Sequence, residues 1–297
     1  MENNVKIDSV VVKPKKSTLL LPNEKPIVQI IILAVIIFCL LFTFMPLFLT
    51  VVNSIKLKPA VQKNVFSLPK LSEIGAAISH NFPKAWSAIG KYYFATIFIA
   101  LIGGVCETVV AALLAYILSF KNFYFKEFIF MLFISILLVP SIIGYPVLIP
   151  LIRETFGLND SYLGYLIPMI GGSQVMGMFL FRTFFGQQPK SLYESAQLDG
   201  ANDLTILAKI TVPLALPIIL YYFVGCFSGI YNEYLWASLI LQQNKTLTIQ
   251  MYAVANGEVQ YGEMYAMYLL ASIPLIVTVI ISMKYFKSGE FAAGLKL

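Results

Sequence analysis

The sequence predicts an all-α membrane protein with six transmembrane helices and both termini on the cytoplasmic side. Of its 297 residues, 59% are hydrophobic and 12% are charged, whereas soluble domains carry about 45–50% apolar and about 25% charged residues. A helix that crosses a bilayer needs roughly 20 consecutive apolar residues. The runs that meet this length are residues 27–52, 92–119, 128–152, 162–185, 214–241 and 265–286. They leave no room for a soluble catalytic domain.

Two of these runs contain prolines or glycines that predict how the helix bends or packs. The third holds Pro140, Pro146 and Pro150, which predicts a broken or kinked helix, because proline removes a backbone donor and clashes with the preceding turn. In the fifth, Gly225 and Gly229 have the small-x-x-x-small spacing typical of closely packed helices. We therefore expect close helix packing at these two glycines.

Lysine and arginine predict the orientation, because cytoplasmic loops carry more of them. Their bias places both termini inside. The stretch before the first run is long and polar and no small-residue cleavage site follows that run, so we expect a retained helix rather than a signal peptide. The predicted organisation is a cytoplasmic tail at 1–26, a transmembrane domain at 27–286 with external loops at 53–91 and 242–262 and a cytoplasmic loop at 188–213, and a cytoplasmic tail at 287–297.

Motifs for catalysis or cofactor binding do not occur in the sequence. It has no phosphate-binding glycine loop, zinc-protease motif or serine nucleophile elbow. The three cysteines fall within predicted spans, and His80, the single histidine, is expected to be an ordinary polar residue of the first external loop. We predict that the chain is not an enzyme and holds no metal or cofactor. The net charge of +6 is spread over loops and tail, which favours a membrane surface over nucleic acid as its counterpart.

The segment "ESAQLDGANDLTILAKITVPLALP", residues 194–217, predicts a short helix hairpin between the fourth and fifth spans. Pro189 suits the start of the first helix, and Asp199-Gly200 is a turn signal. Asn202 or Asp203 can cap the second helix. The hairpin has an apolar face that we expect to find no cover in its own chain. Burial among lipid headgroups is one explanation, but a face rich in Ala and Ser and bordered by carboxylates favours a protein cleft.

This segment resembles the Glu-Ala-Ala coupling loop of ABC importer permeases. It matches at Glu194, Ser195, Ala196, Asp199, Gly200 and Ala201, followed by Ile210, Pro213 and Pro217. Ser195 is the one departure, since it stands where the family has an alanine. The stretches "PLFLTVVNSIK", "NEYLWASLILQQNKTLTIQM" and "QYGEMYAMYLLASIPLIVTVIISMKYFKSGEFAAGL" are similar to the carbohydrate-type permeases, in particular to the second membrane subunit of the maltose-type pair.

The resemblance implies a multi-pass protein of the bacterial inner membrane. It would be a subunit of an ATP-binding-cassette importer that moves a sugar inward by alternating access, and an oligosaccharide is the sugar expected. The implied partners are a second permease subunit, two ATPase subunits or domains that bind ATP and Mg, and an extracytoplasmic sugar-binding protein that the 242–262 loop would reach. The residues matched at 194–196 and 199–201 would then contact the ATPase.

For the solute pathway, the fifth span offers a polar and aromatic cluster of Tyr231, Asn232, Glu233 and Trp236. Ionisable residues within spans are functional candidates by default, although Tyr and Trp also form interface belts. Three alternatives remain open. They are an ion-gradient-driven secondary transporter with Glu107 and Glu233 as ion sites, an ABC importer permease for a non-sugar solute, and an assembly factor that only recruits a soluble partner. The inverted repeats typical of secondary transporters are not evident in the sequence.

Overall fold

The computed structural model describes residues 26–257 and 261–286, and in this part of the chain all regular structure is helical. The predicted tails at 1–26 and 287–297 lie, apart from Pro26, outside the described residues. The elements are α1 (Pro26–Ser54), α2 (Lys58–Lys63), α3 (Leu71–Phe120), α4 (Lys126–Ile136), η1 (Ser141–Gly144), α5 (Tyr145–Pro150), η2 (Leu151–Thr155), α6 (Tyr162–Phe185), α7 (Lys190–Leu198), α8 (Asp203–Ile206), η3 (Leu207–Thr211), α9 (Val212–Leu214), α10 (Leu216–Asn232), α11 (Leu235–Ile240), α12 (Leu247–Ala255) and α13 (Tyr261–Phe286).

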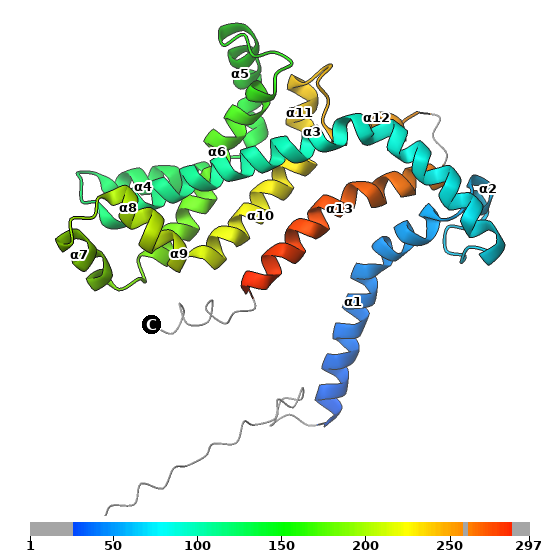
Figure 1. Ribbon diagram of the computed structural model, residues 1–297, viewed down its shortest axis with the longest axis horizontal. Helices are drawn as coiled ribbons and strands as arrows, with labels where there is room; N and C mark the ends of the chain where they lie inside the picture. Colours follow the sequence, from blue (N-terminus) through cyan, green and yellow to red (C-terminus); the bar gives the residue numbers. More distant parts are fainter. Residues whose placement is uncertain (1–25, 258–260, 287–297) are drawn as a thin grey trace, which may run out of the picture. The chain divides into compact units, whose positions relative to one another are not determined.

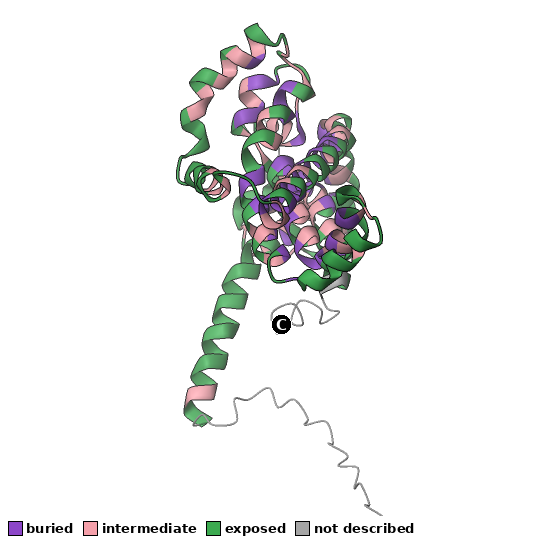
Figure 2. Ribbon diagram, turned by 90° about the vertical axis from the view of Figure 1, so that its left-hand side faces the viewer, coloured by how far each residue is buried: buried purple, intermediate pink, exposed green. Residues whose placement is uncertain are grey.

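The chain divides into two compact units, Met1–Leu49 and Thr50–Leu297. In the second unit, α6, α10 and α13 each pack against the long helix α3, and Figure 1 shows α10 and α13 running beside it. Buried residues gather inside this bundle (Figure 2). They form two apolar clusters, one around Tyr165 and Trp236 and the other around Phe181 and Tyr222.

Among the described residues, four helices are long and apolar enough to cross a membrane, or up to 6 if each of two bent pairs is one span. The prediction of an all-helical, multi-span protein is confirmed. Helix α6 covers Tyr162–Phe185, the same residues as the fourth predicted run. The third run is broken as its prolines predict, with a bend of 94° between α4 and the Ser141–Thr155 segment. Pro140 lies at this break, before η1.

The second span begins far earlier than predicted. Helix α3 runs for 50 residues from Leu71, so much of the predicted external loop at 53–91 is helical. The buried residues Ala77, Asn81, Ala85 and Ile89 recur every four positions along one face, which is helical spacing. The frequent polar residues between them kept the mean hydropathy low and hid this helix. His80 therefore lies on a helix rather than in a loop, with its Nε2 3.1 Å from Oε1 of Glu263.

The fifth span also differs from its predicted limits. It is not one run over 214–241, because α10 ends at Asn232 and α11 starts at Leu235. Glu233 lies at the break with an extended backbone (ψ 123°), and its Oε1 accepts a hydrogen bond from the backbone N–H of Trp236 at 2.8 Å. The predicted external loop at 242–262 contains α12 and the start of α13.

A carboxylate joins two loops near this break. Asp160, just before α6, accepts the backbone N–H groups of Gln242, Gln243 and Asn244 at 2.7, 3.0 and 3.1 Å. The Asn244 side-chain amide donates in turn to the Asp160 carbonyl at 2.7 Å. Burial acts to raise the pKa of Asp160, but the three N–H donors outweigh it and hold the pKa below its ordinary value.

Replacement of Asp160 by asparagine is expected to lower the thermal unfolding midpoint at pH 7 by about 2–4 °C, because each kcal/mol shifts a protein of this size by about that amount. A depressed pKa contributes stability that is fully present above the ordinary value of 3.8 and is lost as the pH falls through the lower folded-state pKa. The difference from wild type, measured in detergent from pH 7 downward, should therefore shrink at acidic pH. Glu154→Gln, at an exposed position nearby, is the control. A difference that is constant with pH would contradict this account.

Candidate functional site

Between α6 and α10 the chain forms a tight structure of short helices, the 189–214 hairpin. After α7 comes Gly200, with a φ of +79°, in the left-handed region that glycine adopts without strain. The Gly200 N–H donates to the Gln197 carbonyl at 3.0 Å, and the Ala201 N–H donates to the Ala196 carbonyl at 2.9 Å. This pair of bonds is the Schellman arrangement that closes a helix end. The turn predicted at Asp199-Gly200 is therefore present.

The second arm of the hairpin starts with a helix cap. Of the two caps predicted, Asn202 is the one used, because its side chain accepts the Thr205 N–H at 2.8 Å. The arm continues through α8, η3 and α9 and then bends by 87° into α10. Pro213 and Pro217 lie in the first turns of α9 and α10 on the two sides of this bend. The second arm thus begins at the Asn202 cap and ends at the bend between Pro213 and Pro217.

Part of the hairpin is buried against its own chain. The ring of Tyr193 on α7 packs against the ring of Phe120 at the end of α3, with 4.1 Å between the two ring centroids. Ile206 and Leu207 of the second arm are also buried, in the same apolar cluster as residues of α3, α6 and α10. The expectation that the apolar face finds no cover in its own chain is wrong for these residues. Sequence periodicity marks such a face but does not show that α3 and α6 extend far enough to cover it.

A polar contact adds to this attachment. Oδ1 of Asp203, on α8, accepts hydrogen bonds from Lys121 Nζ at 2.7 Å and from the Tyr116 hydroxyl at 3.1 Å. The hydrogen bond from Lys121 is the main reason that the pKa of Asp203 lies below its ordinary value. Because the Lys121 and Asp203 side chains are partly exposed, the pair contributes orientation more than stability. Helix α8 is thereby tied to the end of α3.

The outer side of the hairpin is left uncovered by the residues that the structure describes. The predicted contact residues surround one turn, where Glu194, Ser195, Asp199 and Gly200 are exposed and Ala196 and Ala201 are half-buried. Leu198 is 89% exposed and Leu204 is 69% exposed beside them. These two exposed leucines flank the turn and, together with small side chains and carboxylates, form a surface suited to a protein partner.

The predicted pathway residues do not form one open site. Tyr231 is buried, and its hydroxyl donates to the Ala271 carbonyl of α13 at 2.8 Å. Trp236 is buried as well, and its indole N–H donates to the Tyr165 carbonyl of α6 at 3.0 Å. Both side chains hold helices together.

The other two predicted pathway residues differ in their surroundings. Asn232 is exposed and donates to the Ser228 carbonyl of its own helix at 2.9 Å. Glu233, together with Trp236, lines a cavity of about 620 Å³, the Glu233 cavity. Its other lining residues come from the segment after α4, from α5 and from α6, and include Ser141, Tyr145, Met169, Gly172 and Ser173.

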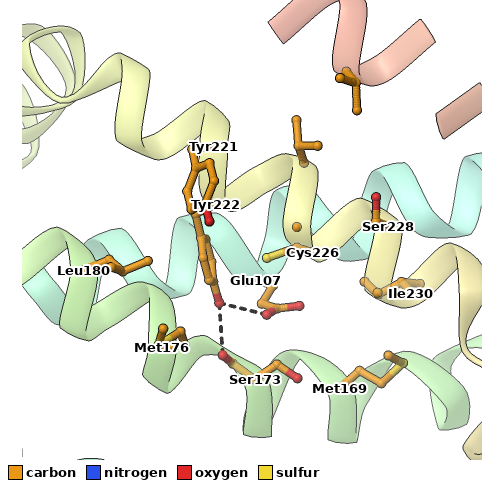
Figure 3. A pocket seen from close by; sticks show the side chains of 14 residues that line it. Glu107, Met169, Ser173, Met176, Leu180, Tyr221, Tyr222, Cys226, Ser228 and Ile230 are labelled. Carbon is orange, nitrogen blue, oxygen red and sulfur yellow. Dashed lines mark hydrogen bonds between the residues drawn. The ribbon is translucent and has the colours of Figure 1, made fainter. Parts of the chain in front are cut away.

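A second cavity, of about 590 Å³, lies among α3, α6, α10 and α13 and is the Glu107 cavity (Figure 3). Glu107, on α3, is 3% exposed. The Tyr222 hydroxyl lies 2.8 Å from Oε1 of Glu107 and 3.0 Å from the Ser173 carbonyl oxygen. Tyr222 and Ser173 were not predicted as site residues, and the only sequence signal near them was an acidic residue within a span.

Gly225 and Gly229 line the Glu107 cavity. A Cβ atom added at either glycine would meet no atom within 4 Å. The prediction that these glycines mediate close helix packing is therefore wrong within this chain. They leave open space along one side of α10 instead.

Helices able to cross a membrane, cavities with polar groups beside them and a capped, partly exposed hairpin between two spans are the features of a membrane component of a transport system. The chain belongs to the family of binding-protein-dependent transport system inner membrane components, which matches residues 108–289. It is accordingly a multi-pass inner-membrane protein and a permease component of a transport system.

Individual relatives agree with this family. The chain is 27% identical over 263 residues to the inner membrane ABC transporter permease protein YcjP of Escherichia coli strain K12, covering 86% of this chain and 92% of that protein. It is 28% identical over 217 residues to the arabinooligosaccharides transport system permease protein AraQ of Bacillus subtilis strain 168, and this match covers 70% of this chain and 75% of that protein. The fold matches a chain of a bacterial ABC transporter involved in the import of the acidic polysaccharide alginate, with a TM-score of 0.77 and 23% identity. The match covers 90% of this chain and 100% of that chain.

Proposed function

We propose that this chain is a membrane-spanning permease subunit of an ATP-binding-cassette importer that moves a sugar inward, with ATP hydrolysis on separate subunits. The 189–214 hairpin carries this proposal, because it is tied to α3 on one side and uncovered on the other. A stiff element of this kind transmits a displacement that a flexible loop would absorb. The chain itself binds no cofactor in this proposal, and ATP and Mg bind to the partner ATPases.

The hairpin docks in a cleft of the ATPase through Glu194, Ser195, Ala196, Asp199, Gly200 and Ala201. Closure of the ATPases pushes the hairpin, and the Tyr193–Phe120 and Asp203–Lys121 contacts pass the displacement to α3. Lys121 is 14 positions after Glu107 in the chain, which is about 21 Å of helix. Movement of one rigid helix thus links the hairpin to the wall of the Glu107 cavity and shifts the permease between inward-facing and outward-facing arrangements.

The sugar substrate is supported by the names of the relatives, since AraQ belongs to an arabinooligosaccharides system. One solved structure of the alginate transporter contains a pentasaccharide-bound periplasmic protein, which supports an extracytoplasmic binding protein as a partner here. A second permease subunit and two ATPase subunits complete the proposed complex. Family membership favours this function over a secondary transporter driven by an ion gradient.

The test is affinity purification of the tagged full-length chain from its native membranes in mild detergent, followed by mass spectrometry and assay of ATP hydrolysis. Wild type is expected to bring an ATPase and a second permease. The double variant Leu198→Glu/Leu204→Glu should lose at least about tenfold of the ATPase, because charges replace apolar contacts at the centre of the interface.

Leu68→Glu is the matched control, since Leu68 is 72% exposed and precedes the start of α3, whereas the hairpin contacts the other end of this helix. It should retain the ATPase. Purification of wild type without any ATPase, or equal recovery of the ATPase with both variants, would overturn the proposed coupling role.

A further inference from the structure

The Glu107 and Glu233 cavities adjoin the same part of α6. Met169 and Ser173 line both of them, so these two side chains lie next to both spaces. Their volumes of about 590 and 620 Å³ fall within the range of about 300–1,000 Å³ that small-molecule sites occupy. Each is large enough for a sugar unit, and together they extend along α6.

The charged side chains that line the two cavities are acidic only. The Glu107 cavity contains one carboxylate, and its other polar side chains are Ser173, Tyr221, Tyr222, Cys226 and Ser228. The Glu233 cavity likewise contains one carboxylate with Ser141, Tyr145, Ser173 and Trp236. No lysine, arginine or histidine occurs among the described residues that line either cavity.

The buried carboxylate of Glu107 has a neutral partner. Tyr222 contacts it through a hydroxyl group, and Figure 3 shows both side chains directed into the cavity. None of the ion pairs within the described residues involves Glu107. A solute that carries a carboxylate or a phosphate would lose its water here without meeting a cation, which is costly in a low-dielectric site. Sugar hydroxyls, in contrast, donate well to carboxylate oxygens.

The geometry points to an uncharged sugar as the solute, with Glu107 accepting hydrogen bonds from its hydroxyls as it passes α10 at Gly225 and Gly229. This inference rests on the proposed function and narrows its substrate class. The open space at both glycines gives the solute access to the backbone of α10, and Tyr222 holds the carboxylate toward that space.

The experiment uses the purified complex with its binding protein in proteoliposomes. ATP hydrolysis and uptake are measured with three probes, the neutral arabinotriose and maltotriose and the anionic trigalacturonate. Wild type should respond to a neutral probe and not to trigalacturonate. Glu107→Gln should lower transport of that neutral probe by about tenfold, the usual effect of losing one hydrogen bond to a charged group, while Glu154→Gln should leave it unchanged.

A second pair of variants tests the same space without changing the carboxylate. Gly225→Leu places a side chain in the cavity, because a Cβ atom added at this position of α10 meets no atom within 4 Å. Gly75→Leu is the control, because it adds the same side chain at a glycine of α3 that is equally uncrowded. The first should block transport while the complex keeps its thermal midpoint and its ATPase, and the second should not. This pair remains informative if Glu107→Gln assembles poorly.

The results distinguish failure of this inference from failure of the proposed function. Transport of trigalacturonate by wild type, or unchanged transport of neutral probes by both Glu107→Gln and Gly225→Leu, would overturn the inference and leave the importer function intact. A complex that contains no ATPase, or that responds to none of the three sugars, would overturn the proposed sugar-importer function and the inference with it.

Discussion

Replacement of Gly200 by proline is expected to reduce sugar uptake to background while the protein remains in the membrane. Gly200 has a φ of +79°, whereas proline fixes φ near −65°. The substitution also removes the N–H that donates to the Gln197 carbonyl. The Schellman turn cannot form, so the surface presented to the ATPase is lost while the spans keep their packing. Uptake by cells and recovery of the ATPase on purification measure the effect.

A graded series at the same position provides the control. Asparagine tolerates the left-handed region better than other non-glycine residues, and alanine there costs roughly 1–2 kcal/mol. Uptake should therefore fall in the order wild type, Gly200→Asn, Gly200→Ala, Gly200→Pro, with equal amounts of each chain in the membrane. Wild-type uptake by the proline variant would contradict the role of this turn.

Replacement of Gly164 by alanine is expected to destabilise the bundle. A Cβ atom at Gly164 would lie 2.4 Å from the Leu158 carbonyl oxygen and 2.9 Å from Cγ2 of Ile152, so backbone must move. Overpacking of this kind typically costs about 1–3 kcal/mol. The expected result is a thermal midpoint several degrees lower, because a protein of this size loses about 2–4 °C for each kcal/mol. Scanning fluorimetry of the purified protein in detergent measures it.

Gly171→Ala on the same helix is the matched control, because its Cβ atom would meet nothing within 4 Å. Alanine is a better helix former than glycine by about 1 kcal/mol, so this variant should unfold at the wild-type temperature or higher. Equal midpoints for the Gly164 and Gly171 variants would show that the close approach to Leu158 does not limit the packing of α6.

Several elements could be predicted from local pattern. Helix α6 is a continuous apolar run and has the limits predicted. The hairpin turn was predictable because Asp199-Gly200 and Asn202 act on backbone groups only a few residues away. The break in the third span followed from Pro140. In each case the interaction that determines the structure lies within one or two helical turns.

Other features depended on distant residues. The first part of α3, from Leu71, is too polar to stand out by hydropathy, and it is helical with Asn81 buried against backbone carbonyls of Ser54 and Lys56. Trp236 reads as a residue of an interface belt or of the solute pathway, yet its indole N–H donates to the Tyr165 carbonyl of α6, 71 positions earlier in the chain. Tyr222 had no signal of its own, because its role depends on the approach of Glu107 from a different helix.

The sequence by itself determined that this is a multi-span helical membrane protein with a capped hairpin between two spans, because apolar run length and turn chemistry act locally. Only the tertiary structure decided which hairpin residues are buried and which remain uncovered, that Tyr231 and Trp236 hold helices together, and that the Glu107 cavity contains a carboxylate without a cation. These properties arise where α3, α6, α10, α11 and α13 pack against one another. Contacts between residues that far apart along the chain leave no periodicity in a single sequence.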